Sequence, residues 1–248
     1  MRRLPKENIL YFGDTARAPY GHRTPSEVLQ FTRQIVEYLL RYHPKMIVIA
    51  CNTATAAALE TIRNECPVPV VGVIEPGARA ALKLKGKGIV GVLGTEGTIR
   101  SGAYEEALHR LSPETRVISL ACPGFVPLVE SGMHLSEEAR TIVKSTLIPI
   151  AGQPMDALIL GCTHYPYLSA FISEAMGPDV RLISSAEETA SEVKQILAAG
   201  SLDRKERAAP KHIFLCSGNT DLFRRVAEQW LKRPVTVSPL DKPMISML

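Results

Sequence analysis

Short apolar runs rich in Val and Ile alternate along the chain with longer segments whose apolar positions follow a helical period. This alternation is typical of parallel sheets that are covered by helices. The apolar runs predict strands at residues 9–13, 46–50, 69–73, 89–93, 116–120, 157–160, 181–183, 212–215 and 235–237. The predicted fold class is therefore α/β.

Two helix starts are well marked. Thr24, Pro25 and Glu27 form a capping box with a proline at the first helical position, which predicts a helix running to about residue 41. Ser136 is followed by two glutamates, and acidic residues are favourable at the positive N-terminal end of a helix, so a second helix is predicted to begin there. Residues 199–210 contain Gly, Ser, several charges and a closing Pro, which is typical of an exposed connection.

Two segments resemble each other at a distance of 111 positions. Residues 46–53 (MIVIACNT) and 157–164 (ALILGCTH) each run from an apolar strand into a cysteine, then a threonine and a helix-forming stretch. This pseudo-repeat predicts two similar α/β halves that present equivalent strand ends. Ligands of open α/β sheets bind at the carboxyl ends of strands, so Cys51 and Cys162 lie where chemistry is expected.

A cysteine between a strand and a helix faces unpaired backbone N–H groups, which predicts a lowered pKa of its thiol. The same N–H groups can bind a substrate carboxylate. Two such ends facing each other would place one thiol on each side of a small carboxylate substrate. The alternative is that both cysteines are buried strand-end residues and that the polar residues after them only cap helices. Two occurrences in matching context favour the functional interpretation.

The charge distribution argues against a nucleic-acid-binding protein, and the apolar pattern argues against a membrane protein. The net charge of +4 lies entirely in residues 201–248, where Arg204, Lys205 and Arg207 interleave with acidic residues instead of forming a basic stripe. Nucleic-acid binding is therefore not expected. The apolar run at residues 46–51 is too short to cross a bilayer, and the N-terminus opens no signal segment, so we expect a cytoplasmic protein without membrane contact.

The five cysteines include no C-x-x-C pair, so neither a disulfide framework nor a zinc site is expected. Cys66, Cys122 and Cys216 are interpreted as small buried hydrophobic residues.

Residues 86–91 fit the pattern G-x-G-x-x-G, but a helical segment precedes them and a strand follows. A dinucleotide fingerprint needs the opposite order, so we interpret the motif as a helix-to-strand turn.

Five motifs together resemble the bacterial glutamate racemases across almost the whole chain. They are residues 11–21 (YFGDTARAPYG), 50–55 (ACNTAT), 72–77 (GVIEPG), 94–98 (GTEGT) and 161–166 (GCTHYP). The resemblance implies a cofactor-independent isomerase that interconverts L- and D-glutamate through two cysteines and supplies D-glutamate for peptidoglycan synthesis. Related aspartate racemases typically carry an acidic residue at the position of His164, which favours glutamate as the substrate.

The resemblance also implies roles for individual residues. Cys51 would take the Cα proton of D-glutamate and Cys162 that of L-glutamate, and His164 and Glu130 would assist proton transfer. The implied substrate contacts are Tyr20, Gly21, Asn52, Thr53, Thr95, Thr98, Thr163 and His164. Without the resemblance, Glu130 would be interpreted as a solvated helix residue, Tyr20 and Gly21 as a turn, and Thr95 and Thr98 as helix caps. The spacing of Cys162 and His164 does not settle whether they touch.

The resemblance predicts two pseudo-symmetric domains, each a mostly parallel sheet flanked by helices, with the active site in the cleft between them. The expected boundaries are residues 1–73 plus 186–248 for one domain and 74–185 for the other. Glutamate is the expected small-molecule partner, no metal is expected, and a homodimer is compatible with the family.

The sequence departs from the family pattern in two places. The family motif Asp-Ser-Gly-x-Gly-Gly is not found, and residues 1–5 resemble the end of the helix that follows it, so we expect this chain to have weak activity or none. Ser184 stands where the family usually has Asp. Two other functions therefore stay open at this stage: racemisation or decarboxylation of another small carboxylate such as aspartate, and a catalytically impaired substrate-binding protein.

Overall fold

The computed structural model describes residues 1–84, 88–206, 208–238 and 240. In chain order the elements are β1 (Ile9–Gly13), α1 (Pro25–Leu40), β2 (Ile47–Ile49), α2 (Asn52–Glu65), β3 (Val70–Gly72), α3 (Ile74–Leu82), β4 (Ile89–Gly94), α4 (Glu96–Arg100), α5 (Ala103–Leu111), β5 (Arg116–Ala121), α6 (Phe125–Glu130), α7 (Glu137–Leu147), β6 (Ala157–Gly161), the 3-10 helix η1 (Tyr165–Leu168), α8 (Ser169–Met176), β7 (Arg181–Ser184), α9 (Ser185–Ala199), β8 (His212–Cys216), α10 (Thr220–Leu231) and β9 (Val237–Ser238).

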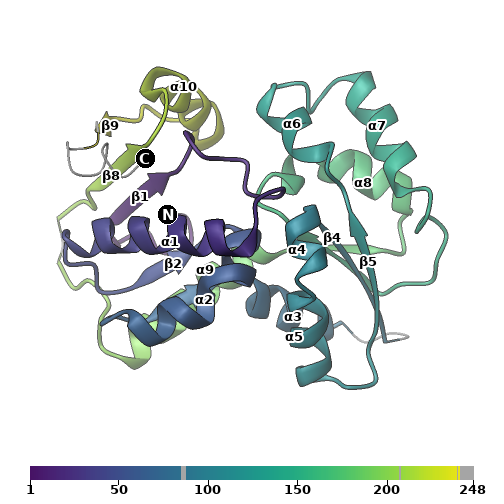
Figure 1. The fold of residues 1–248 in the computed structure, drawn as a ribbon, viewed down its shortest axis with the longest axis horizontal. Helices are drawn as coiled ribbons and strands as arrows, with labels where there is room; N and C mark the ends of the chain where they lie inside the picture. The colour runs from purple at the N-terminus through teal and green to yellow at the C-terminus, as the bar shows by residue number, and fades with distance from the viewer. Residues whose placement is uncertain (85–87, 207, 239, 241–248) are drawn as a thin grey trace.

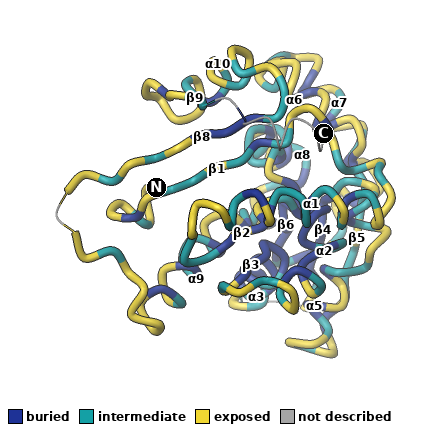
Figure 2. The backbone as a smooth tube through the Cα atoms, turned by 60° about the vertical axis from the view of Figure 1, so that its left-hand side comes forward, coloured by how far each residue is buried: buried dark blue, intermediate teal, exposed yellow. Residues whose placement is uncertain are grey.

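One body of the molecule is built on a parallel sheet in the order β5-β4-β6-β7. The central strand β6 is buried along its whole length, because helices cover both faces of the sheet (Figure 2). On one face, Leu158 and Leu160 pack with α6, α7 and α8. On the other face, Ile159 packs with α3 and α5. Figure 1 shows these teal and green elements together on one side of the molecule.

The second body contains both ends of the described chain (Figure 1). Its described strands form two parallel sheets, β1-β8-β9 and β2-β3. Helix α1 packs against both sheets, because Val36 belongs to the apolar cluster around Ile49 of β2 whereas Tyr38 contacts the cluster around Leu215 of β8. On β3, Val71 packs with α9.

The structure confirms the predicted fold class and most of the predicted elements. The capping box forms as expected: the Thr24 hydroxyl accepts from the Glu27 backbone N–H at 3.2 Å, and the Glu27 carboxylate accepts from the Thr24 N–H at 2.9 Å. Strand β9 begins two residues later than predicted. The reason is that the Val235 N–H donates to the Glu228 carboxylate at 3.1 Å and not to a neighbouring strand.

Two sequence expectations are only partly reached by the described residues. Positions 86 and 87 of the glycine-rich motif lie outside them, but α3 ends before the motif and β4 begins within it, which is the order that we predicted. The connection at 199–210 is largely exposed where it is described. The domain boundaries at residues 73 and 185 stay a prediction.

Gly72 is a tight packing point between β3 and α2. A Cβ at this position would lie 2.5 Å from Thr55 Cγ2 and 2.7 Å from Leu59 Cδ2. We therefore predict that Gly72→Ala lowers the free energy of unfolding by about 1–3 kcal/mol, which urea denaturation measures. Gly124→Ala is the matched control, because its Cβ would meet only one atom, at 3.9 Å. Equal stabilities of the two variants would contradict this packing.

Candidate active site

Cys51 and Cys162 lie at equivalent places in the two bodies. Cys51 follows β2 after one intervening residue and is the N-cap of α2, and Cys162 directly follows β6. All strands of each sheet run in parallel, so both cysteines lie at the carboxyl ends of strands. A charge on Cys51 raises the pKa of Cys162, which shows that the fold brings the two thiols within electrostatic reach.

Each sulfur faces hydrogen-bond donors from the residues that follow it. The backbone N–H groups of Thr53 and Ala54 and the Thr53 hydroxyl point to Cys51. The backbone N–H groups of His164 and Tyr165 point to Cys162. These are the unpaired donors of a helix start, and they favour a thiolate.

The predicted lowering of the thiol pKa values is nevertheless wrong for the ligand-free protein. Burial raises the pKa of Cys51 above its usual range and outweighs its donors. Burial likewise raises the pKa of Cys162 to about 12, and the charges of Cys51 and Glu130 add to the effect. The sequence argument counted the helix-terminal donors but not the desolvation of the thiolate, which is the larger effect here.

His164 joins Cys162 to Glu130. His164 Nδ1 lies 3.6 Å from Cys162 Sγ, and its Nε2 lies 3.2 Å from Glu130 Oε1. The contact is feasible although the residues are two apart, because the backbone from Cys162 to His164 forms a turn before η1 and not a regular helix. Glu130 is the last residue of α6 and is half exposed. Thr163 is exposed, with its hydroxyl 3.4 Å from His164 Nδ1.

Three threonines link the two bodies beside Cys51. The Thr53 hydroxyl lies 2.9 Å from that of Thr95 and 3.1 Å from that of Thr98, and the latter two hydroxyls are 3.1 Å apart. Thr95 is also the N-cap of α4, so it combines the structural role with a position at the site. Gly21 joins this group, because its carbonyl accepts from the Gly97 N–H at 2.9 Å.

Tyr20 lies near Cys51, but its hydroxyl is held by Asp14. The Tyr20 O–H donates to the Asp14 carboxylate, which also accepts from Arg17 Nε at 2.7 Å and from the Ser217 hydroxyl at 2.8 Å. Burial raises the pKa of Tyr20, and a charge on Cys51 adds to this. The largely buried carboxylate therefore fixes the loop between β1 and α1, a role to which no signal in the sequence pointed.

Asn52 is buried and accepts a hydrogen bond from Tyr104 of the other body at 2.7 Å. Sequence reasoning missed Tyr104, because an aromatic residue at a helical apolar position is indistinguishable from an ordinary core residue. The fold thus gathers Cys51, Asn52, Thr53, Thr95, Thr98, Gly21 and Tyr20 at one strand end and Cys162, Thr163, His164 and Glu130 at the other.

A family model described as Asp/Glu/Hydantoin racemase matches residues 2–193. The chain belongs to this racemase family. It is 51% identical to a glutamate racemase of Bacillus cereus over 95% of this chain and 87% of that protein. Its structure superimposes on glutamate racemase isoform RacE1 from Bacillus anthracis with a TM-score of 0.94 and 45% identity, covering 98% of this chain and 91% of that one. Glutamate racemase from Francisella tularensis in complex with D-glutamate gives a TM-score of 0.90 at 31% identity, with 97% and 90% coverage.

The remaining cysteines of this racemase-family chain lie in or beside the packed cores. Cys122 and Cys216 are buried, as predicted, and Cys66 is partly buried against the cluster around α2. All five thiols are free.

Within the described residues, no three His, Cys, Asp or Glu side chains form a group that could hold a metal ion. No helix among these residues is long and apolar enough to cross a membrane.

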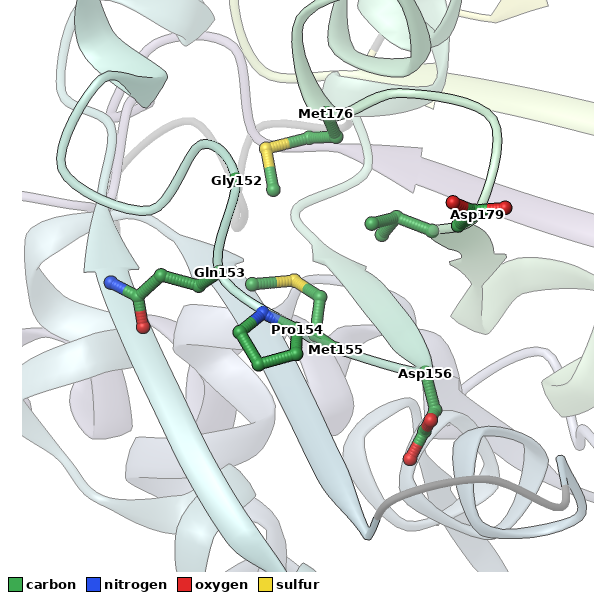
Figure 3. A pocket seen from close by; sticks show the side chains of 8 residues that line it. Gly152, Gln153, Pro154, Met155, Asp156, Met176 and Asp179 are labelled. Atoms are coloured by element: carbon green, nitrogen blue, oxygen red, sulfur yellow. The ribbon is translucent and has the colours of Figure 1, made fainter.

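A separate pocket of about 410 Å³ lies away from the cysteines. Figure 3 shows Met155, Met176 and Asp179 around it. These residues precede β6 and β7 or end α8, so the pocket lies at the amino ends of the strands, opposite Cys162. The strand-end rule for ligands of parallel sheets therefore does not favour it as the active site.

The raised thiol pKa values predict a steep pH dependence of alkylation. Only the thiolate reacts, so the rate of iodoacetamide labelling at Cys51 and Cys162 should rise about tenfold per pH unit between about pH 7 and pH 9, without a plateau. Glu130→Gln removes one charge that raises the pKa of Cys162, so the Cys162 curve should move to lower pH while the Cys51 curve stays. Peptide mass mapping measures both sites, and a plateau near neutral pH would contradict the prediction.

Proposed function

We propose that this chain interconverts L- and D-glutamate without a cofactor, using Cys51 and Cys162 as two acid/base residues. The observation that carries the proposal is the placement of one thiol at a strand end of each body, close enough for the charge of one to act on the other. A base on each side of Cα is the arrangement that inversion of a stereocentre by proton transfer requires.

The comparisons support glutamate as the substrate. The Bacillus cereus relative is a glutamate racemase, and the Francisella tularensis neighbour is one in complex with D-glutamate. The aspartate racemase from Picrophilus torridus shares 17% identity and a TM-score of 0.53 with this chain, which is a likeness of fold alone. The sequence resemblance further supports a role in supplying D-glutamate for peptidoglycan synthesis.

In the proposed reaction, the Cys51 thiolate removes the Cα proton of D-glutamate. The S–H bond forms as the C–H bond breaks, and the electron pair moves onto the α-carboxylate. The Cys162 thiol then delivers its proton to the opposite side of Cα, which gives L-glutamate and leaves Cys162 as the thiolate. The reverse direction exchanges the two roles. His164, with Glu130 behind it, lies at hydrogen-bond distance of Cys162 and would assist the transfer there.

Ionisation of a buried thiol needs compensation. The substrate α-ammonium group supplies a positive charge beside the thiolate, and the N–H donors of Thr53, Ala54, His164 and Tyr165 supply fixed dipoles. We propose that Asn52, Thr53, Thr95, Thr98 and Thr163, with Tyr20 and Gly21, contact the substrate. Because the hydroxyl of Tyr20 is held by Asp14, its ring and backbone are the groups left for this contact.

The two-base mechanism is tested by racemisation in deuterium oxide. Starting from L-glutamate, without added pyridoxal phosphate, we expect D-glutamate to carry deuterium at Cα while the remaining L-glutamate keeps protium early in the reaction. Cys51→Ala and Cys162→Ala should each lower kcat by about 10²–10⁴-fold, the usual share of a general acid or base. Polarimetry and mass spectrometry follow the two readouts.

Cys66→Ala is the matched control, because Cys66 ends α2 and lies outside the site. Its turnover should stay within about twofold of the wild type, as for most substitutions away from a functional feature. Equal turnover of L-aspartate and L-glutamate would contradict the substrate assignment. Wild-type turnover retained in either active-site variant would contradict the two-base mechanism, and no exchange at Cα in the wild type would favour a binding protein.

A further inference from the structure

Tyr104 is a buried residue of α5 that touches both cysteine motifs. Its hydroxyl donates to Asn52 Oδ1 at 2.7 Å, and Asn52 directly follows Cys51. Its ring packs against Gly161, which directly precedes Cys162: a Cβ at Gly161 would lie 3.0 Å from Tyr104 Cε2. Both Tyr104 and Asn52 are 2% exposed. One side chain therefore connects the two strand ends that carry the thiols.

The Tyr104 phenol is the donor in this hydrogen bond. Burial raises the pKa of Tyr104 well above its usual range, and the nearby Ser185 side chain offsets this only in part. The phenol therefore keeps its proton. Its proton is directed to Asn52 Oδ1, because an amide oxygen can only accept a hydrogen bond.

This arrangement leaves one group of Asn52 without a partner. With Oδ1 accepting from Tyr104, the amide nitrogen needs an acceptor elsewhere. The Asn52 Nδ2 atom is buried and has no hydrogen-bond partner among the described residues. A buried N–H donor beside a reactive thiol is costly unless a ligand supplies the acceptor, and a carboxylate oxygen is a strong one.

We propose that Tyr104 is a positioning residue for the reaction: it holds the Asn52 amide so that Nδ2 donates to a carboxylate oxygen of the substrate next to Cys51. The proposal rests on the proposed function, because it assigns the acceptor to glutamate. It differs from a role in packing, since the ring fills the space beside Gly161 while only the hydroxyl orients Asn52.

The test is Tyr104→Phe, which keeps the ring and removes the hydroxyl. We expect KM to rise about tenfold for both enantiomers with a smaller change in kcat, the effect of losing one oriented hydrogen bond. Asn52→Ala should raise KM to a similar extent, and the double variant should be no worse than Asn52→Ala alone, because the two residues act through one contact. The two enantiomers have equal free energies, so kcat/KM must fall by the same factor in both directions.

Tyr38→Phe is the control for loss of a buried phenol, because Tyr38 lies in α1 and belongs to the apolar cluster with Leu215. Its KM should equal that of the wild type. An unchanged KM in Tyr104→Phe, or effects of Tyr104→Phe and Asn52→Ala that multiply in the double variant, would overturn the proposal.

Failure of the proposed function is recognised separately, because the wild type would then show no racemisation at all. In that case, calorimetric titration with D-glutamate compares the Kd of the wild type with the Kd of Tyr104→Phe, in place of KM. A tenfold weaker Kd supports the orientation of Asn52, and equal Kd values, or no binding by the wild type, overturn it.

Discussion

The placement of the partly buried Cys51 and the buried Cys162 within reach of each other's charge is the constraint on which the rest of this structure depends. Desolvation disfavours either thiolate, and a charge on Cys51 makes a second charge on Cys162 costlier still. At most one of the two is therefore ionised near neutral pH. A reaction that needs one base and one acid at the same moment is served by this coupling, since ionisation of one sulfur keeps the proton on the other.

The electrostatic coupling of the two thiols requires a fixed distance between the two bodies, and hydrogen bonds between polar side chains of the two bodies provide it. Thr53 bonds to Thr95 and Thr98, and Asn52 bonds to Tyr104, so the residues directly after Cys51 are anchored on the opposite body. The strand ends bring the cysteines to the correct edges of their sheets, but they do not set the separation of the edges. These bonds hold the two edges at a defined separation, on which the coupling of the thiols depends.

The predictability of the molecule follows from the range of the interactions involved. Strand and helix positions came from local patterns such as the Thr24 capping box, and the equivalence of Cys51 and Cys162 came from a repeated motif. The contact of His164 with Cys162 depends on a turn, and the contact of Tyr104 with Asn52 depends on the packing of elements far apart in the sequence. The thiol pKa values depend on how completely the fold removes water from each sulfur, and this cannot be predicted from any short stretch of the sequence.

The two strand ends that the proposed reaction would use for the two enantiomers are chemically unequal. Cys162 has an imidazole backed by a carboxylate at hydrogen-bond distance, whereas the side chain that donates to Cys51 is the hydroxyl of Thr53. Under the proposed mechanism, the resting protein would have two protonation isomers of different free energy, one ready for each enantiomer. In the proposed cycle each turnover leaves the protein in the isomer that accepts the product, so the return of a proton from one sulfur to the other is a separate step. At high substrate concentration, that internal return competes with rebinding of product.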